Sequence, residues 1–94
     1  MKAVWTKLAK EDLEAALQYI SKENPAAAKA LGARLLSVLE TIREHPHTGR
    51  PGKVEGTREF VLTGTAYILV YLVRPDALVI VSFLHSSRRW PPFS

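Results

Sequence analysis

The sequence of 94 residues contains no cysteine, which excludes a disulfide framework, a thiolate nucleophile and thiolate metal ligands. It also lacks any run near the roughly 18 apolar residues that a membrane-spanning helix requires. Its first residues do not include the apolar segment of a secretory signal peptide. We therefore expect a cytoplasmic protein with no membrane partner.

Acidic residues are missing from the end of the chain, where none follows Asp76. The whole sequence has 13 Lys and Arg against nine Asp and Glu, a formal net charge of +4. The last segment instead carries His85, Arg88 and Arg89. A basic end suits an anionic partner, but charge alone does not choose among nucleic acid, ribosomes and acidic proteins.

Motifs of common enzyme sites are absent as well. The sequence has no glycine-rich phosphate loop, no serine nucleophile motif and no Cys-His pair. His45 and His47 flank a proline without the three or four ligands that zinc usually takes. We expect no metal site and no cofactor.

The length and the 47% apolar content fit one domain spanning residues 1–94. Apolar residues at helical spacing predict a first helix from about Lys7 to Lys22, with Thr6 as its N-cap. Asn24 and Pro25 are typical of a helix start, so a second helix is predicted from Pro25 to about Glu44. The linker of two or three residues requires an antiparallel hairpin. The predicted buried positions are Leu13, Ala16, Leu17 and Ile20 in the first helix and Leu31, Leu35, Val38, Leu39 and Ile42 in the second.

Segments rich in β-branched and aromatic residues predict strands over Lys2–Trp5 and over residues 58–63, 67–73 and 77–84. Residues 45–56, with two prolines and three glycines, are predicted to form a loop. The fold class is therefore α+β with the order β-α-α-β-β-β, a helix hairpin packed on a small, mostly antiparallel sheet. The other face of the sheet must be covered by a partner or by the tail, where Trp90 and Phe93 are available.

Five fragments in this order resemble the RelE/ParE superfamily of type II toxin–antitoxin toxins. They are His45–Gly52, Gly56–Glu59, Tyr67–Tyr71, Phe83–His85 and Arg88–Pro91. The resemblance spans essentially the whole chain and implies a cognate antitoxin as partner.

The superfamily contains two activities on one fold, so fold alone does not decide between them. RelE-like members cleave mRNA in the ribosome, and ParE-like members poison DNA gyrase. This chain has Glu59 and Ile68 where the RelE-like pattern has basic residues, and its Pro-Pro-Phe-Ser ending lacks the terminal helix and tyrosine of those nucleases. The departures favour a ParE-like gyrase inhibitor that is not an enzyme. A ribosome-dependent mRNA endonuclease and a non-toxic, antitoxin-binding remnant of the fold remain alternatives.

Each of these functional hypotheses assigns roles to particular residues. RNA cleavage needs a base, an acid and cations, and a nuclease would draw them from His85, Arg58, Arg88 and Arg89. The expected target-binding residues are Arg58, His85, Arg88, Arg89 and Trp90. The expected antitoxin-binding residues are Tyr67, Tyr71, Leu84, Trp90 and Phe93. We expect no sequence-specific DNA binding by this chain alone.

Purely structural roles are the alternative for the same residues. His85 would then end a strand and bond the backbone, and the arginines would be solvated. Trp90 would cap the open face of the sheet as part of the core.

Overall fold

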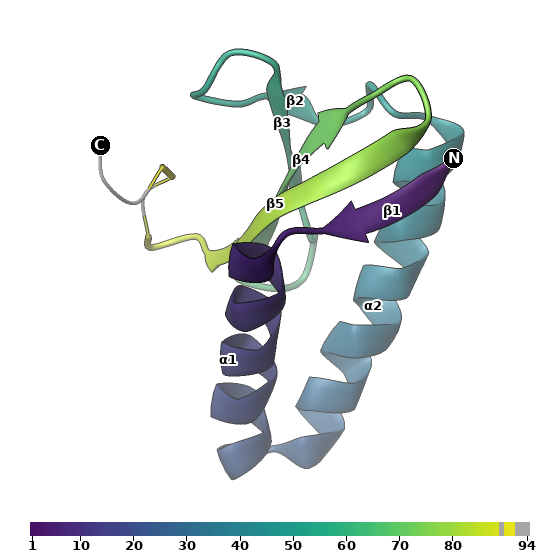
Figure 1. Ribbon diagram of the computed structural model, residues 1–94. Helices are drawn as coiled ribbons and strands as arrows, with labels where there is room; N and C mark the ends of the chain where they lie inside the picture. The colour runs from purple at the N-terminus through teal and green to yellow at the C-terminus, as the bar shows by residue number, and fades with distance from the viewer. Residues whose placement is uncertain (89, 92–94) are drawn as a thin grey trace.

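The computed structural model describes residues 1–88, 90 and 91. Two helices lie against one face of a five-stranded sheet and extend beyond it (Figure 1). In sequence order the elements are β1 (Lys2–Trp5), α1 (Lys7–Glu23), α2 (Pro25–Glu44), β2 (Arg50–Pro51), β3 (Thr57–Val61), β4 (Tyr67–Val73) and β5 (Ala77–His85). The predicted fold class is confirmed. None of the described helices is both long and apolar enough to cross a membrane.

Both helices begin at the predicted caps. The side chain of Thr6 accepts a hydrogen bond from the Ala9 N–H at 3.1 Å, and that of Asn24 accepts one from the Ala27 N–H at 3.1 Å. Asn24 also ends α1, because its own N–H donates to the Ile20 carbonyl. The linker is thus one residue, shorter than predicted. A linker this short turns α2 back antiparallel to α1.

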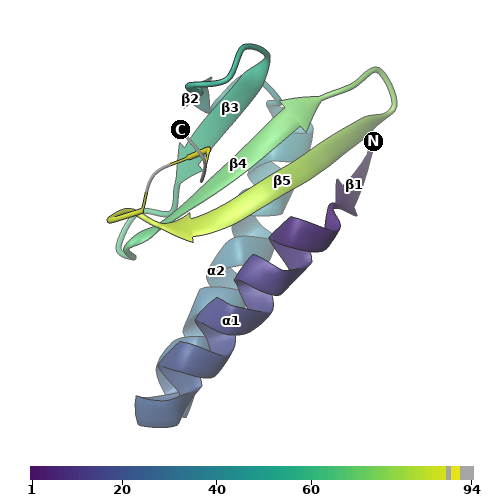
Figure 2. The ribbon, with the colours of Figure 1, turned by 60° about the vertical axis from the view of Figure 1, so that its left-hand side comes forward.

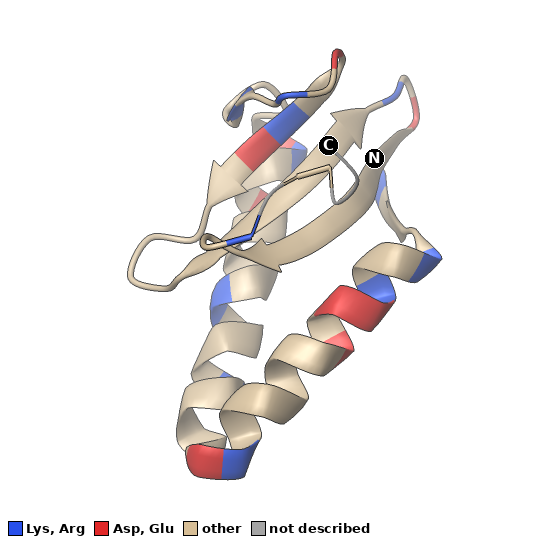
Figure 3. Ribbon diagram, turned by 90° about the vertical axis from the view of Figure 1, so that its left-hand side faces the viewer, with Lys and Arg blue, Asp and Glu red and all other residues tan. Residues whose placement is uncertain are grey.

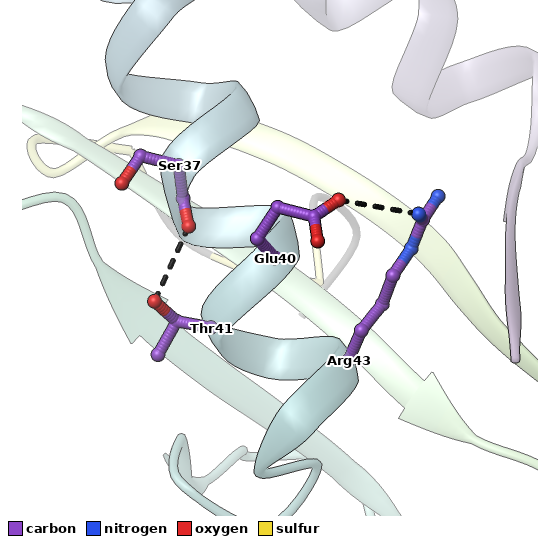
Figure 4. A network of polar contacts seen from close by, with 4 residues as sticks. All are labelled: Ser37, Glu40, Thr41 and Arg43. Atoms are coloured by element: carbon purple, nitrogen blue, oxygen red, sulfur yellow. Dashed lines mark hydrogen bonds and ion pairs between the residues drawn. The ribbon is translucent and has the colours of Figure 1, made fainter.

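The outer face of α2 is polar near its end. Figure 4 shows the Thr41 hydroxyl donating to the Ser37 carbonyl and Arg43 paired with Glu40 one turn earlier. Both members of the ion pair are exposed, so it adds little stability. The inner face supplies the predicted buried stripe, Leu31, Leu35, Val38, Leu39 and Ile42.

The strand order across the sheet is β1-β5-β4-β3-β2. Strand β1 runs parallel to β5, and the other neighbouring pairs are antiparallel. Opposite Val70 lies Ser82, whereas opposite Tyr71 lies Ile80, so Val81 is the extra residue of a bulge in β5. Core residues on the helix-facing side include Leu69, Tyr71 and Ile80.

One element was missed. Within residues 45–56, which were predicted to form only a loop, Arg50 and Pro51 pair with Glu59 and Arg58 as the two-residue strand β2. A segment this short has no period that a sequence pattern can reveal.

The loop that precedes β2 is held by polar contacts from Tyr71 and Arg58. The Tyr71 hydroxyl donates to the Pro46 carbonyl at 2.7 Å and accepts from the Gly49 N–H at 3.0 Å. The Arg58 guanidinium donates to the carbonyls of Gly49 and His47 at 2.7 and 3.2 Å. A Cβ at position 49 would lie 2.7 Å from the Tyr71 hydroxyl, so this close approach requires glycine.

We predict that Tyr71→Phe lowers the free energy of unfolding by about 1–3 kcal/mol, because it leaves a buried donor and acceptor without their partner. The melting temperature should fall by several degrees in a domain of this size. Tyr19→Phe is the control, because Tyr19 is 75% exposed and should tolerate the same change. Equal melting curves for the two variants would contradict the assigned role of Tyr71.

The alkaline limb of the stability curve tests the same hydroxyl. Burial raises the pKa of Tyr71, while the hydrogen bond from Gly49 and the charge of Arg58 act in the opposite direction. With the folded-state pKa above the unfolded value, this group's contribution is complete below about pH 10 and is lost at higher pH. Tyr71→Phe should therefore flatten the fall in stability above that pH.

Candidate functional site

A groove of about 720 Å³ runs between α1 and the second half of β5. Strand β1 pairs with β5 only from Ala77 to Ile80, so the outer edge of residues 81–85 has no neighbouring strand among the described residues. Helix α1 lies beside that edge instead (Figure 2). We call this hollow the α1–β5 groove.

Asp12 ties α1 to the edge. Its carboxylate accepts the Ser82 hydroxyl at 2.8 Å and the Phe83 N–H at 3.0 Å. A charged acceptor makes such bonds stronger than neutral ones. A side chain of α1 therefore occupies the Phe83 N–H of this edge and holds the helix beside the groove.

The helical wall of the groove is largely apolar. Leu8, Ala15 and Tyr19 line it together with Asp12. Tyr19 is 75% and Leu8 43% exposed, although both are large apolar side chains. Their positions one helical stripe away from the core give α1 a second apolar face.

The opposite wall carries an aromatic group. The Tyr67 ring stacks on the Phe83 ring with their centroids 5.0 Å apart. It also makes an edge-to-face contact with the His85 ring, with a centroid distance of 5.5 Å. Leu84, Arg88 and Trp90 continue this wall. The groove thus offers apolar area, with Asp12 and Arg88 as the charged residues of its described lining.

The bonding of His85 limits its chemistry. The Ser87 N–H donates to Nδ1 at 3.1 Å, and the Ser87 hydroxyl lies 2.8 Å from the same nitrogen. Because a backbone N–H can only donate, Nδ1 is the acceptor and the neutral ring carries its proton on Nε2. Neither nitrogen is then a free base.

The residues expected to bind the target do not all lie at one site. His85, Arg88 and Trp90 line the groove. Arg58 lies opposite Tyr71 on the neighbouring strand, and its guanidinium donates to the Gly49 carbonyl of the loop. Tyr71 and Tyr67, the residue that pairs with His85, are four positions apart on β4, or about 13 Å. Arg89 lies outside the described residues.

Among the expected antitoxin-binding residues, Tyr67, Leu84 and Trp90 line the groove together. The expectation for Tyr71 is wrong, because this side chain has no exposed surface and its hydroxyl is committed to the loop. Phe93 lies outside the described residues.

Three groove residues were not predicted: Leu8, Asp12 and Tyr19. Leu8 and Tyr19 share a helical face with Ala15, and a helical projection of α1 would have revealed this second stripe. No sequence pattern marks Asp12, because its partners lie 70 and 71 residues away in the chain.

The tail crosses the sheet on the face opposite the helices, as Figures 2 and 3 show for its described part. There Trp90 lines a hollow together with Ile68 and Val70, and it is half-buried. The position agrees with a covering role on the open face. In the described part of the chain, no three His, Asp or Glu side chains gather in a way that could hold a metal ion.

Comparison with known proteins places the chain in a family. Residues 3–90 match the family described as the ParE toxin of type II toxin–antitoxin system, parDE. The Y4kP protein of Sinorhizobium fredii is 36% identical over 87 residues, covering 93% of this chain and 90% of that protein. The toxin RelE2 of Caulobacter vibrioides is 33% identical over 85 residues, covering 90% and 94%.

A solved structure from the chromosomal ParDE system of P. aeruginosa superposes with a TM-score of 0.79. The match covers 90% of this chain and 95% of that one. At 20% identity it shows that the two chains share a fold. With the family match over nearly the whole length, the chain belongs to the ParE toxins of the RelE/ParE superfamily and is the toxin of a type II toxin–antitoxin system, which implies a cognate antitoxin.

Proposed function

We propose that this toxin inhibits growth by binding DNA gyrase in the cytoplasm, without cleaving RNA. The bonding of His85 carries this proposal. An endonuclease of the RelE kind needs an unprotonated nitrogen or carboxylate to take the 2′-hydroxyl proton. Here the only lone pair of the His85 ring is held by Ser87.

The cations support the same choice. Arg58, the one basic candidate on β3, donates to two loop carbonyls. It also lies about 13 Å along the sheet from His85. A phosphorane would need positive charge close to the attacked phosphate. Arg58 and His85 are too far apart to act on the same phosphate.

A ribosome-dependent endonuclease is the second candidate function. The relative named toxin RelE2 carries the name of that branch, and His85 and Arg88 line the same groove. Rotation of Ser87 away from the ring would free Nδ1. This candidate is therefore tested alongside the first.

We further propose that the α1–β5 groove binds the cognate antitoxin. An amphipathic segment suits a groove with apolar walls, and helix-in-groove binding commonly uses such surfaces. The exposed Tyr19 and Leu8 supply area that water otherwise contacts. Arg88 in the lining offers a cation to an acidic residue of that segment.

Induction in a bacterium tests the target. We expect a DNA-damage response and no ribosome-dependent cleavage of mRNA. The growth inhibition caused by His85→Ala should stay within several-fold of that caused by the wild type. His47→Ala is the control, because its side chain is exposed in the loop. Loss of a general acid or base would instead cost about 10²–10⁴ in rate.

Three results would overturn the proposal in different ways. Cleaved mRNA with a folded, non-toxic His85→Ala protein would identify a nuclease. Growth inhibition with neither readout would point to another target. No inhibition at all, with antitoxin binding intact, would identify a non-toxic remnant of the fold.

The groove is tested by Tyr19→Ala. Because this side chain is mostly exposed, the melting temperature should change little, while affinity for the cognate antitoxin should fall by at least about tenfold if Tyr19 is an anchor. Leu36→Ala is the matched control, since Leu36 is 67% exposed on α2 and does not line the groove. Equal affinities of the two variants, measured by calorimetry, would reject the groove as the antitoxin site.

A further inference from the structure

The open face of the sheet carries a second, smaller hollow, which we call the open-face pocket. Its apolar lining comes from Ile68, Val70 and Leu84, and Trp90 is its aromatic member. Its volume is about 140 Å³. The charged residues around it are Arg50, Lys53, Glu59 and Arg88.

The charges in this pocket do not cancel. Arg50 donates from Nε and Nη2 to one oxygen of Glu59, at 3.1 and 3.0 Å. The Glu59 side chain is only 11% exposed, so this pair is a neutral unit within the lining. Within the described part of the chain, Lys53 and Arg88 belong to no ion pair. An excess of two positive charges therefore faces an apolar lining.

Size narrows the class of ligand. Sites for small molecules usually enclose roughly 300–1,000 Å³, and this pocket is less than half the lower bound. It suits the end of one side chain. Two free cations select an anionic group, and the lining of Ile68, Val70 and Leu84 selects one with apolar neighbours.

The Trp90 indole adds an unused donor. Its Nε1–H is buried and has no acceptor among the described residues. Buried donors in native proteins are nearly always bonded. An anionic oxygen bound beside the indole would supply an acceptor once the ring turns this nitrogen toward it.

We propose that the open-face pocket binds a carboxylate side chain on an acidic segment of a protein partner. Lys53 and Arg88 hold the carboxylate, and Trp90 with the apolar lining contacts its aliphatic neighbour. The inference rests on the proposed function only in taking that partner to be the growth-inhibition target. RNA is disfavoured, because nucleic-acid affinity comes from many phosphate contacts along a track, and this single pocket offers two cations outside its one ion pair.

Nuclear magnetic resonance of the full chain tests the pocket directly. The probes are a blocked Leu-Asp-Leu-Glu peptide, its Leu-Asn-Leu-Gln counterpart and a short oligouridine. We expect the acidic peptide alone to shift the amides of Lys53 and Arg88 and the indole signal of Trp90. The Trp5 indole, on the helix-facing side, is the internal reference.

Matched double variants supply the control. Lys53→Gln with Arg88→Gln should weaken binding of the acidic peptide at least about tenfold. Lys29→Gln with Arg34→Gln removes the same charges from exposed positions on α2 and should leave binding unchanged. Raising the salt from about 50 to about 300 mM should weaken the wild-type complex several-fold.

Shifts of equal size with the uncharged peptide, or no shift at all, would overturn the proposal. Tighter binding of oligouridine at the same residues would replace it with an RNA site. Purified gyrase is a separate arm. If gyrase fails to bind while the acidic peptide binds as expected, the proposed target is wrong and the pocket stands.

Discussion

Incomplete pairing of β5 shapes the surface between α1 and the sheet. Strand β1 accompanies β5 only as far as Ile80, and the bulge at Val81 follows directly. Beyond that point the edge would present unpaired backbone groups, which invite pairing with another chain. Asp12 on α1 bonds the Phe83 N–H, and Thr6 at the N-cap of α1 bonds the carbonyls of Ile80 and Val81, so these two residues take up part of this role. The α1–β5 groove lies beside this unpaired edge.

The end of β5 and the tail after it join the two surfaces to which we assign binding. Leu84, Arg88 and Trp90 line both the α1–β5 groove and the open-face pocket. A partner in the groove would therefore touch the residues that form one wall of the pocket. If the groove takes the antitoxin and the pocket the target, neutralisation needs no long-range conformational change. Contact through a shared wall is enough to couple the two sites.

Prediction from sequence succeeded where local patterns carry the information. The caps at Thr6 and Asn24 and the apolar spacing of α2 located the helices, because these signals act within a few residues. The same approach missed β2 and assigned Tyr71 to an interface, although its hydroxyl is committed to the loop. The Tyr71 hydroxyl bonds groups 22 and 25 positions away. The β2 pairing and the Arg58 bonds join groups 7 to 11 positions apart, across a loop. Local charge and periodicity do not encode such contacts.

We propose that this toxin acts by binding, because the ring of His85 is engaged in a turn. The most direct test is the ¹⁵N chemical shifts of the His85 imidazole in the purified toxin at neutral pH. We predict an unprotonated, hydrogen-bonded Nδ1 and a protonated Nε2, with the Nδ1 signal changing in Ser87→Ala. A ring protonated on Nδ1 with a free Nε2 lone pair would contradict the account, because it would leave the base that RNA cleavage needs.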